Sequence, residues 1–277
     1  MQYEPEVLRR LQLVLLDMLK DIDSVCRENG IEYFLDAGTC LGAIRHDGFI
    51  PWDDDVDLGM RRADYERFLE IAPAALGEGY VVAHPKSDKR VAGMFAKVWR
   101  KGTVFSTRET VEAGLPQGIF VDIFPYDGVH ADEGRARKQL RACRKWQNVS
   151  YLYHSKAITV PHDGILGKVE RAACAIAHGA VRAALSPERI AASFEKAATS
   201  AAAEAGDMLA DMAYTQFGRF PVETLFPTRL HRFEDAELPV PGDPEGYLEI
   251  AYGPTWRELP PEERRRNHAP LVLDFGD

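Results

Sequence analysis

A dense group of carboxylates close to the start of the sequence constrains the fold more than any other feature. Residues 53–57 read Asp-Asp-Asp-Val-Asp, so four acidic side chains fall within five positions. Burying like charges this close together without compensation costs roughly several kcal/mol. Apolar residues at positions 56, 58 and 60 alternate with polar or small ones, which is the period of a half-buried strand. The pattern predicts that Asp55 and Asp57 project from one face of a strand, about 7 Å apart.

Carboxylates held side by side on a rigid strand favour a hard divalent cation. Oxygen ligands suit Mg²⁺ or Mn²⁺. A solvated acidic turn is the alternative, but the apolar alternation and the preceding Phe-Ile-Pro-Trp segment at 49–52 favour a fixed site. We therefore predict that Asp55 and Asp57 bind metal, with Asp53 as a weaker or indirect ligand.

A second strand candidate carries another carboxylate. Residues 118–125 read Gly-Ile-Phe-Val-Asp-Ile-Phe-Pro, the most apolar strand pattern in the chain, with Asp122 in its middle. A buried carboxylate there needs a partner. A structural Asp that caps a turn is one interpretation. We predict instead that Asp122 lies on a strand beside 55–57, completes the metal site and acts as general base toward an acceptor hydroxyl.

Other residues near this cluster suit a phosphorylated ligand. Gly38 and Thr39 form a small-residue turn at the start of a predicted helix, where backbone N–H groups can bind an anion. Arg45 and Lys97 are the cationic candidates for diphosphate oxygens. For Arg45 a surface salt bridge is an equal alternative. With one or two divalent ions, such a site suits in-line phosphoryl displacement.

Composition narrows the class of protein. The chain has 277 residues, 45% hydrophobic and 28% charged, with a formal charge of −9, which argues against a general nucleic-acid surface. Its four cysteines are scattered without metal-ligand spacing, which fits a reducing, cytoplasmic setting. The N-terminal residues lack the pattern of a signal peptide, and the most apolar long stretch, 172–185, is too short and polar to span a bilayer.

Periodicity predicts the order of the elements. Helices are expected at 5–29, 39–45 and 61–75, and strands at 31–35, 80–83, 94–99 and 103–106, the last two as a hairpin. An Ala-rich helical region follows from 132 to about 205, with a helix start at Ser186-Pro187. We therefore predict a catalytic core at 1–130, a helical subdomain at 131–205 and a C-terminal segment at 206–277 that completes the active-site region.

The motifs together resemble a known family. The stretch from Gly38 to Asp57 closely resembles the LicD family, and Asp64-Tyr65 with Phe68 continue the likeness. So do the segments Val121-Asp122-Ile123-Phe124-Pro125 and Asp127-Gly128, and in the C-terminal part Tyr252-Gly253, Leu259-Pro260-Pro261 and His268. The central region, about 130–205, resembles the family much less.

The resemblance implies an α+β fold of the nucleotidyltransferase type, a mixed β-sheet flanked by helices with a helical insertion. It implies a phosphotransferase that uses CDP-choline, CDP-ribitol or CDP-glycerol, modifies a cell-surface glycan such as capsule or teichoic acid, or its lipid-linked precursor, and releases CMP. It assigns metal binding and catalysis to Asp55, Asp57 and Asp122, phosphate contact to Gly38 and Thr39, and further ligand contacts to Arg45, Lys97 and His268. A cytoplasmic location is expected, with peripheral association at the inner face of the membrane.

Three other interpretations remain open. A nucleotidyltransferase would move a nucleoside monophosphate to a small hydroxyl compound and release pyrophosphate rather than CMP. A glycosyltransferase with an Asp-x-Asp motif would place that motif after a longer βαβ nucleotide-binding region, whereas here it appears by residue 57, after one predicted helix and one short strand. A glycan-binding module would not need a metal triad and would show no calorimetric response to Mg²⁺ with a CDP compound.

Overall fold

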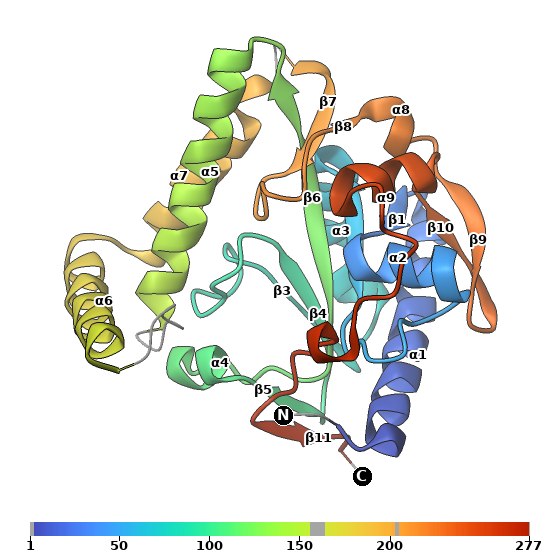
Figure 1. The fold of residues 1–277 in the computed structure, drawn as a ribbon, viewed down its shortest axis with the longest axis horizontal. Coiled ribbons are helices and arrows are strands. Elements are labelled where there is room, and N and C mark those ends of the chain that lie inside the picture. The colour runs from blue at the N-terminus through green and yellow to red at the C-terminus, as the bar shows by residue number, and fades with distance from the viewer. Residues whose placement is uncertain (1–2, 156–163, 203–204, 277) are drawn as a thin grey trace.

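The longest strand, β6 (Phe120–His130), organises the sheet in the computed structural model, which describes residues 3–155, 164–202 and 205–276 (Figure 1). β6 pairs in parallel with β2 (Asp57–Arg61) and antiparallel with β4 (Ala96–Arg100). Its second half pairs antiparallel with β7 (Ala205–Asp211). One strand thus joins the acidic N-terminal region to a segment more than 80 residues further along the chain.

Seven strands form this mixed sheet. β1 (Tyr33–Leu35) pairs with β2, and β3 (Tyr80–Ala83) pairs with β4, which gives the order β1-β2-β6-β4-β3. β8 (Phe220–Pro221) extends the sheet beyond β7. The two short sheets are β9 (Arg229–Phe233) with β10 (Ala236–Val240), and β5 (Val104–Ser106) with β11 (Val272–Asp274). The chain is α+β, as the sequence analysis expected.

Three helices pack close to the acidic strand. α1 (Pro5–Asn29) buries one apolar face, including Leu11, Leu15 and Ile22, and ends at Gly30, whose φ of 60° allows the chain to reverse. α2 (Ala37–His46) and α3 (Arg62–Ala75) precede and follow β2. The predicted helices at 5–29, 39–45 and 61–75 are confirmed, with α2 beginning two residues earlier.

Two local predictions were wrong. β5 does not form a hairpin with β4, because β3 and β6 already occupy both edges of β4; β5 pairs with β11 instead. The acidic strand also begins later than expected. β2 starts at Asp57, so Asp55 lies in the extended segment before the strand, where it has no ladder partner.

Three helices make up most of the segment between β6 and β7. They are α5 (Glu133–His154), α6 (Gly164–Ala184) and α7 (Pro187–Ala198), followed by a 3-10 turn at Thr199–Ala201. The predicted start at Ser186 is confirmed, because its side chain accepts a hydrogen bond from the N–H of Arg189 and Pro187 is the first helical residue. No helix in the described ranges is long and apolar enough to cross a membrane.

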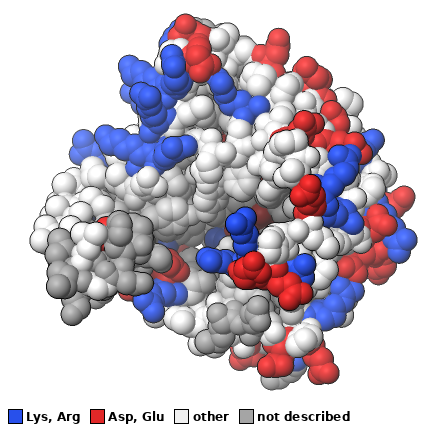
Figure 2. Space-filling model, in the orientation of Figure 1, with Lys and Arg blue, Asp and Glu red and all other residues white. Residues whose placement is uncertain are grey.

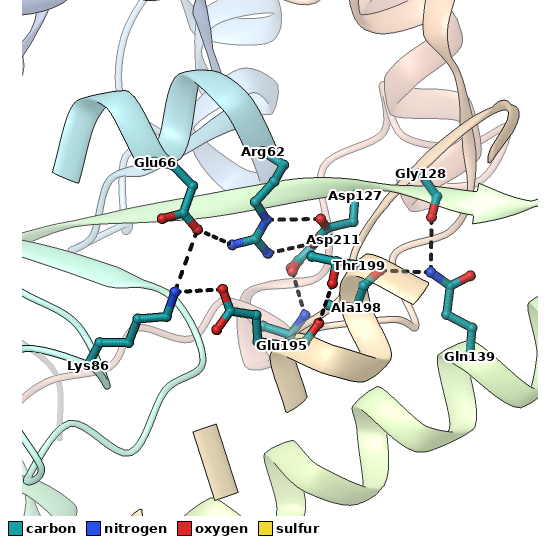
Figure 3. Close-up of polar contacts among 11 residues, drawn as sticks. Arg62, Glu66, Lys86, Asp127, Gly128, Gln139, Glu195, Ala198, Thr199 and Asp211 are labelled. Atoms are coloured by element: carbon teal, nitrogen blue, oxygen red, sulfur yellow. Dashed lines mark hydrogen bonds and ion pairs between the residues drawn. The ribbon is translucent and has the colours of Figure 1, made fainter. Parts of the chain in front are cut away.

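Buried polar contacts fix these helices to the sheet (Figure 3). The amide of Gln139 on α5 donates to Gly128 O on β6 at 2.9 Å and to Ala198 O on α7 at 2.8 Å. Arg62 on α3 donates to both carboxylate oxygens of Asp127, at 2.9 and 2.6 Å. The helical segment is therefore held against the same strand that carries Asp122.

The C-terminal part returns to the acidic region. Its helices are α8 (Val222–Leu225) and α9 (Pro244–Tyr252), with a 3-10 turn at Glu262–Arg264; α4 (Arg108–Ala113) lies beside the β5–β11 pair (Figure 1). Tyr247 of α9 stacks on Phe220 and its hydroxyl contacts Asp36 at the start of α2. The domain boundaries at 130 and 205 stay predictions.

Candidate active site

Asp57 and Asp122 lie opposite each other on β2 and β6. They are direct partners in the parallel ladder, and Asp122 N–H donates to Val56 O at 2.9 Å. Thr39 Oγ1 accepts a hydrogen bond from Asp57 N–H at 2.9 Å, so the first turn of α2 is attached to the first residue of β2. The two carboxylates thus stand on rigid backbone that is fixed from both sides.

A cavity of about 280 Å³ joins the predicted carboxylates. Asp55, Asp57 and Asp122 all line it, and His268 reaches it from the C-terminal segment. The remaining lining residues are Asp36, Ala37, Phe124, Tyr126, Asp211, Tyr214, Gln216 and Phe217. A pocket of this size, with several acidic groups and aromatic walls, can accept part of a small charged ligand.

Two cations already contact two of these carboxylates. Lys97 Nζ lies 2.5 Å from Asp122 Oδ1, with both side chains largely buried. His268 Nδ1 lies 3.2 Å from Asp55 Oδ2. Asp57 differs, because within the described ranges no group donates a hydrogen bond to its carboxylate and no cation pairs with it.

Burial and mutual repulsion set the charge states. Burial, together with the charges of Asp55 and Asp122, holds the pKa of Asp57 well above its ordinary value. Burial also raises the pKa of Asp122, to about 6, although the Lys97 ammonium opposes the rise. Burial acts in the same direction on Asp55, but the hydrogen bond and charge of His268, with smaller contributions from Asp53 and Lys97, together leave the pKa of Asp55 below its usual range. Asp57 is therefore the carboxylate with the most to gain from an added cation.

The donor set is that of a hard divalent ion, since all three side chains offer carboxylate oxygens and one of them is uncompensated. The side chains are nevertheless not arranged as a ligand cluster. In the part of the chain that the structure describes, no three His, Cys, Asp or Glu side chains stand in metal-coordinating positions. Asp122 and Asp55 point toward Lys97 and His268 instead. The residue types and their convergence fit a metal, and its binding stays a prediction.

The Gly38–Thr39 pair lies within the first turn of α2 rather than before the helix. Asp36 is the N-cap, and its side chain accepts from Ala37 N–H at 2.8 Å. A Cβ at Gly38 would lie 3.0 Å from Asp53 Oδ2, so glycine lets this carboxylate approach the helix start. Burial and the neighbouring Asp55 hold the pKa of Asp53 well above its ordinary value.

Arg45 lies apart from the cavity. Its guanidinium donates to the carbonyl oxygens of Trp256 at 3.1 Å and Glu258 at 3.2 Å, which ties the end of α2 to the C-terminal segment. The structure therefore brings Lys97, His268 and Thr39 to the carboxylates, while Arg45 contacts backbone elsewhere.

Several residues of the site were not identified from the sequence. Asp54 is buried and accepts hydrogen bonds from Tyr3 at 2.8 Å and from His268 N–H at 2.8 Å, so it attaches both ends of the chain to the acidic segment. Asp211 lies at the end of β7, and burial, with the charge of Asp36, raises its pKa to about 8. The sequence could have identified Asp36, because an Asp directly before a helix is a common N-cap. The sequence could not have identified Asp211, since the residues of β7 form no recognisable motif.

A second cavity, of about 240 Å³, adjoins the first at Asp122 and Tyr214. Phe95, Phe120 and Tyr151 contribute aromatic walls, and the Lys97 ammonium lies 3.7 Å from the centre of the Phe120 ring. Tyr151 and Tyr214 share a hydrogen bond of 2.8 Å between their hydroxyls. The Lys97–Asp122 ion pair thus stands between an acidic cavity and an aromatic one.

Comparison with known proteins agrees with this geometry. The family model described as LicD/FKTN/FKRP, nucleotidyltransferase domain, matches residues 30–165, which include α2, β2, β4 and β6. The chain is 39% identical over 123 residues to lipopolysaccharide cholinephosphotransferase LicD of Haemophilus influenzae, covering 44% of this chain and 45% of that protein. It is 37% identical over 114 residues to an uncharacterised protein of Rickettsia prowazekii, covering 40% and 43% respectively.

A more distant likeness extends to animal proteins. Ribitol 5-phosphate transferase FKRP of Homo sapiens is 33% identical over 84 residues, which cover 30% of this chain and 17% of that protein. The matches span less than half the length of these relatives. The family model's range, 30–165, holds the paired strands β2 and β6 and the acidic segment. Residues 30–165 of the chain therefore belong to the LicD/FKTN/FKRP nucleotidyltransferase domain family.

Proposed function

We propose that this chain is a metal-dependent phosphotransferase of the LicD type. It would transfer a phospho-substituent, such as phosphocholine, from a CDP-activated donor to a hydroxyl of a cell-surface glycan or its lipid-linked precursor. The observation that carries the proposal is the convergence of Asp55, Asp57 and Asp122 on one cavity of the family-matched domain. The names of two relatives, a cholinephosphotransferase and a ribitol 5-phosphate transferase, support this class of reaction.

The proposed chemistry is a displacement at phosphorus. The acceptor hydroxyl oxygen forms a bond to the phosphorus that carries the substituent, and the bond from that phosphorus to the CMP oxygen breaks. Asp122 takes the hydroxyl proton, because a pKa of about 6 leaves it ionised at neutral pH yet more basic than an ordinary carboxylate. CMP leaves with the electron pair of the broken bond.

The neighbouring residues position the reacting groups and neutralise the negative charge of the phosphate. Lys97, 2.5 Å from Asp122, keeps that carboxylate oriented and supplies positive charge close to the reacting phosphate. The first turn of α2, with Gly38 and Thr39, presents N–H groups that lack intrahelical acceptors and can bind a phosphate oxygen. These groups need no covalent step, in keeping with phosphoryl transfer by positioning and charge neutralisation.

Mg²⁺ or Mn²⁺ is the proposed cofactor, with Asp55, Asp57 and Asp122 as its ligands. When bound, such an ion neutralises the diphosphate oxygens of the donor. Support comes from Asp57, whose raised pKa reflects burial and the charges of Asp55 and Asp122. The donor is one of CDP-choline, CDP-ribitol and CDP-glycerol. A cytoplasmic position at the inner face of the membrane belongs to the same proposal.

A product assay tests this function. The full chain is incubated with each CDP donor, Mg²⁺ and a glycan acceptor, and CMP is measured, while a parallel reaction with CTP is assayed for pyrophosphate. We expect CMP release that requires acceptor and is lost in Asp57→Asn but kept in Asp17→Asn, an exposed acid on α1. Pyrophosphate from CTP, with no CMP from any donor, would support nucleotidyl transfer instead.

A further inference from the structure

Helix α5 concentrates positive charge on a chain that is acidic as a whole. The formal charge of the chain is −9, yet α5 contains six Lys or Arg residues and one acidic residue, Glu133. All six basic side chains are exposed: Arg135, Arg137, Lys138, Arg141, Arg144 and Lys145. Figure 2 shows blue side chains gathered over α5 on this face. Within the described ranges, Lys138 and Arg141 have no ion-pair partner, so this charge is available to a ligand.

A groove between α5 and α7 lies within this basic surface. Its volume is about 500 Å³, and its described lining includes Arg135, Lys138 and Lys196 with the hydroxyls of Ser193 and Ser200. No Asp or Glu is among those lining residues. Lys138 and Lys196 have no ion-pair partner among the described residues, so their charge suits a phosphate group.

The neighbouring helix α6 exposes apolar surface. The side chains of Ile176 and Leu166 are 75% and 53% exposed, and residues 172–181 contain no Lys, Arg, Asp or Glu. His178 Nδ1 donates to Leu152 O at 2.7 Å, which holds α6 against the C-terminal end of α5. Trp146 on α5 lines the groove between α5 and α7. Basic and apolar surfaces are therefore joined on one helical layer.

We propose that α5, α6 and α7 form a docking face for a membrane surface that contains anionic lipids. The basic side chains of α5 would face the lipid phosphates, and the groove would hold one phosphate headgroup. Ile176 and Leu166 would enter the interfacial region. A basic helix beside exposed apolar side chains is what interfacial binding requires, whereas a nucleic acid would gain little from α6. The proposal rests on the membrane position given under the proposed function, and its vesicle assay is separate from the CMP assay, so the failure of one is distinguishable from the failure of the other.

Vesicle sedimentation of the full chain tests this face. The vesicles are phosphatidylcholine alone, or phosphatidylcholine mixed with phosphatidylglycerol. We expect binding only to the mixed vesicles, weakening as salt is added. The double variant Lys138→Glu/Arg141→Glu should bind at least about 30-fold less tightly, from roughly 1 kcal/mol for each basic residue at an anionic surface. The matched control Lys101→Glu/Arg232→Glu changes the same charge at exposed positions on other elements and should bind like the parent chain.

A second pair of variants separates the apolar contribution. Ile176→Ser should reduce binding to the mixed vesicles several-fold. Leu230 is also exposed, at 53%, but lies on β9, so Leu230→Ser should not reduce this binding. Both substitutions are at exposed positions, and circular dichroism checks that each variant folds. Equal binding by the parent and the α5 double variant would overturn the proposal. So would tighter binding to a DNA or RNA oligonucleotide than to mixed vesicles.

Discussion

Asp57 and Asp122 are direct ladder partners on the parallel strands β2 and β6, but their surroundings are unequal. Asp122 has the Lys97 ammonium at 2.5 Å, whereas no described residue supplies a cation or hydrogen-bond donor to the Asp57 carboxylate. The pair therefore holds an uncompensated acid beside a compensated one. This asymmetry makes different predictions for the two residues.

Removing the charge of Asp57 should stabilise the metal-free protein. Asp57→Asn keeps the shape of the side chain and ends its repulsion with Asp55 and Asp122, which raises its pKa after the larger effect of burial. We expect the free energy of unfolding at pH 8 to rise by about 1–2 kcal/mol. Thermal unfolding without divalent ions measures this, with Asp17→Asn as control. A lower melting temperature for Asp57→Asn would contradict the assigned repulsion.

Lys97 should contribute stability through Asp122. Lys97→Met leaves the Asp122 carboxylate buried beside other acids, and breaking a buried ion pair costs roughly 3–5 kcal/mol. We expect the free energy of unfolding to fall by an amount toward the lower end of this range, because Asp122 can take up a proton. In the double variant Lys97→Met/Asp122→Asn no unpaired charge is left, so most of the loss should be recovered. Chemical denaturation of the four members of this cycle gives the coupling energy, and additive losses would show that the ion pair is not the cause.

The carboxylate pairing could be predicted from the sequence because local patterns determine it. Alternating apolar residues identify β2, and an isolated Asp in the most apolar strand identifies Asp122. The sequence predicts that the two strands are neighbours but not their register, because β6 is buried on both faces and alternation does not fix the pairing. The same reasoning placed Asp55 on β2, and it failed there because the ladder with β6 begins only at Asp57.

The rest of the site depends on contacts between distant segments. His268 N–H reaches Asp54 across 214 positions, and β7 brings Asp211 to the cavity from beyond the helical segment. No periodicity in either segment specifies such a partner. The predicted β4–β5 hairpin shows the same limit, because the turn at 100–102 looked sufficient while β6 had already taken the edge of β4.

Gln139 should be important for holding the helical segment to the sheet. Its amide donates to Gly128 O and to Ala198 O (Figure 3). Its Oε1 accepts from His130 N–H at 3.2 Å. Gln139→Leu leaves these backbone groups without partners in a buried position, at a cost of about 1–3 kcal/mol for each unsatisfied group. Hydrogen exchange should show faster opening of α5 and α7 with the β2 amides still protected. Unchanged exchange in α5 would contradict this role.

Stability of the metal-free protein should fall as pH rises from about 3.9 to about 8. Asp211 has a pKa raised to about 8 by burial and Asp36, against an unfolded value of about 3.9. Between these values the folded state holds a proton that the unfolded state has released, so its contribution is full below about 3.9 and is lost as pH rises through about 8. Within this window Asp211 lowers the free energy of unfolding by about 1.4 kcal/mol per pH unit.

The variant Asp211→Asn isolates this contribution. Other buried acids, including Asp57, titrate in the same direction, so the parent chain alone cannot identify Asp211. Urea unfolding at several pH values between about 6 and 8 should give a smaller slope for the variant than for the parent. Parallel curves would show that Asp211 is ionised throughout, held by its bonds to the N–H groups of Ala213 and Tyr214.

Magnesium should oppose this loss of stability at high pH. A divalent ion binds the ionised carboxylates, so it competes with the protons that Asp57 and Asp122 retain when their pKa values are raised. We expect Mg²⁺ to raise the melting temperature more at pH 8 than at pH 6. At a concentration about 100 times its dissociation constant, Mg²⁺ should raise the free energy of unfolding by about 2.7 kcal/mol. Asp57→Asn should remove most of this response, although that variant starts from a more stable metal-free state. A response to Mg²⁺ that is equal at both pH values and survives in Asp57→Asn would place the ion elsewhere on this acidic chain.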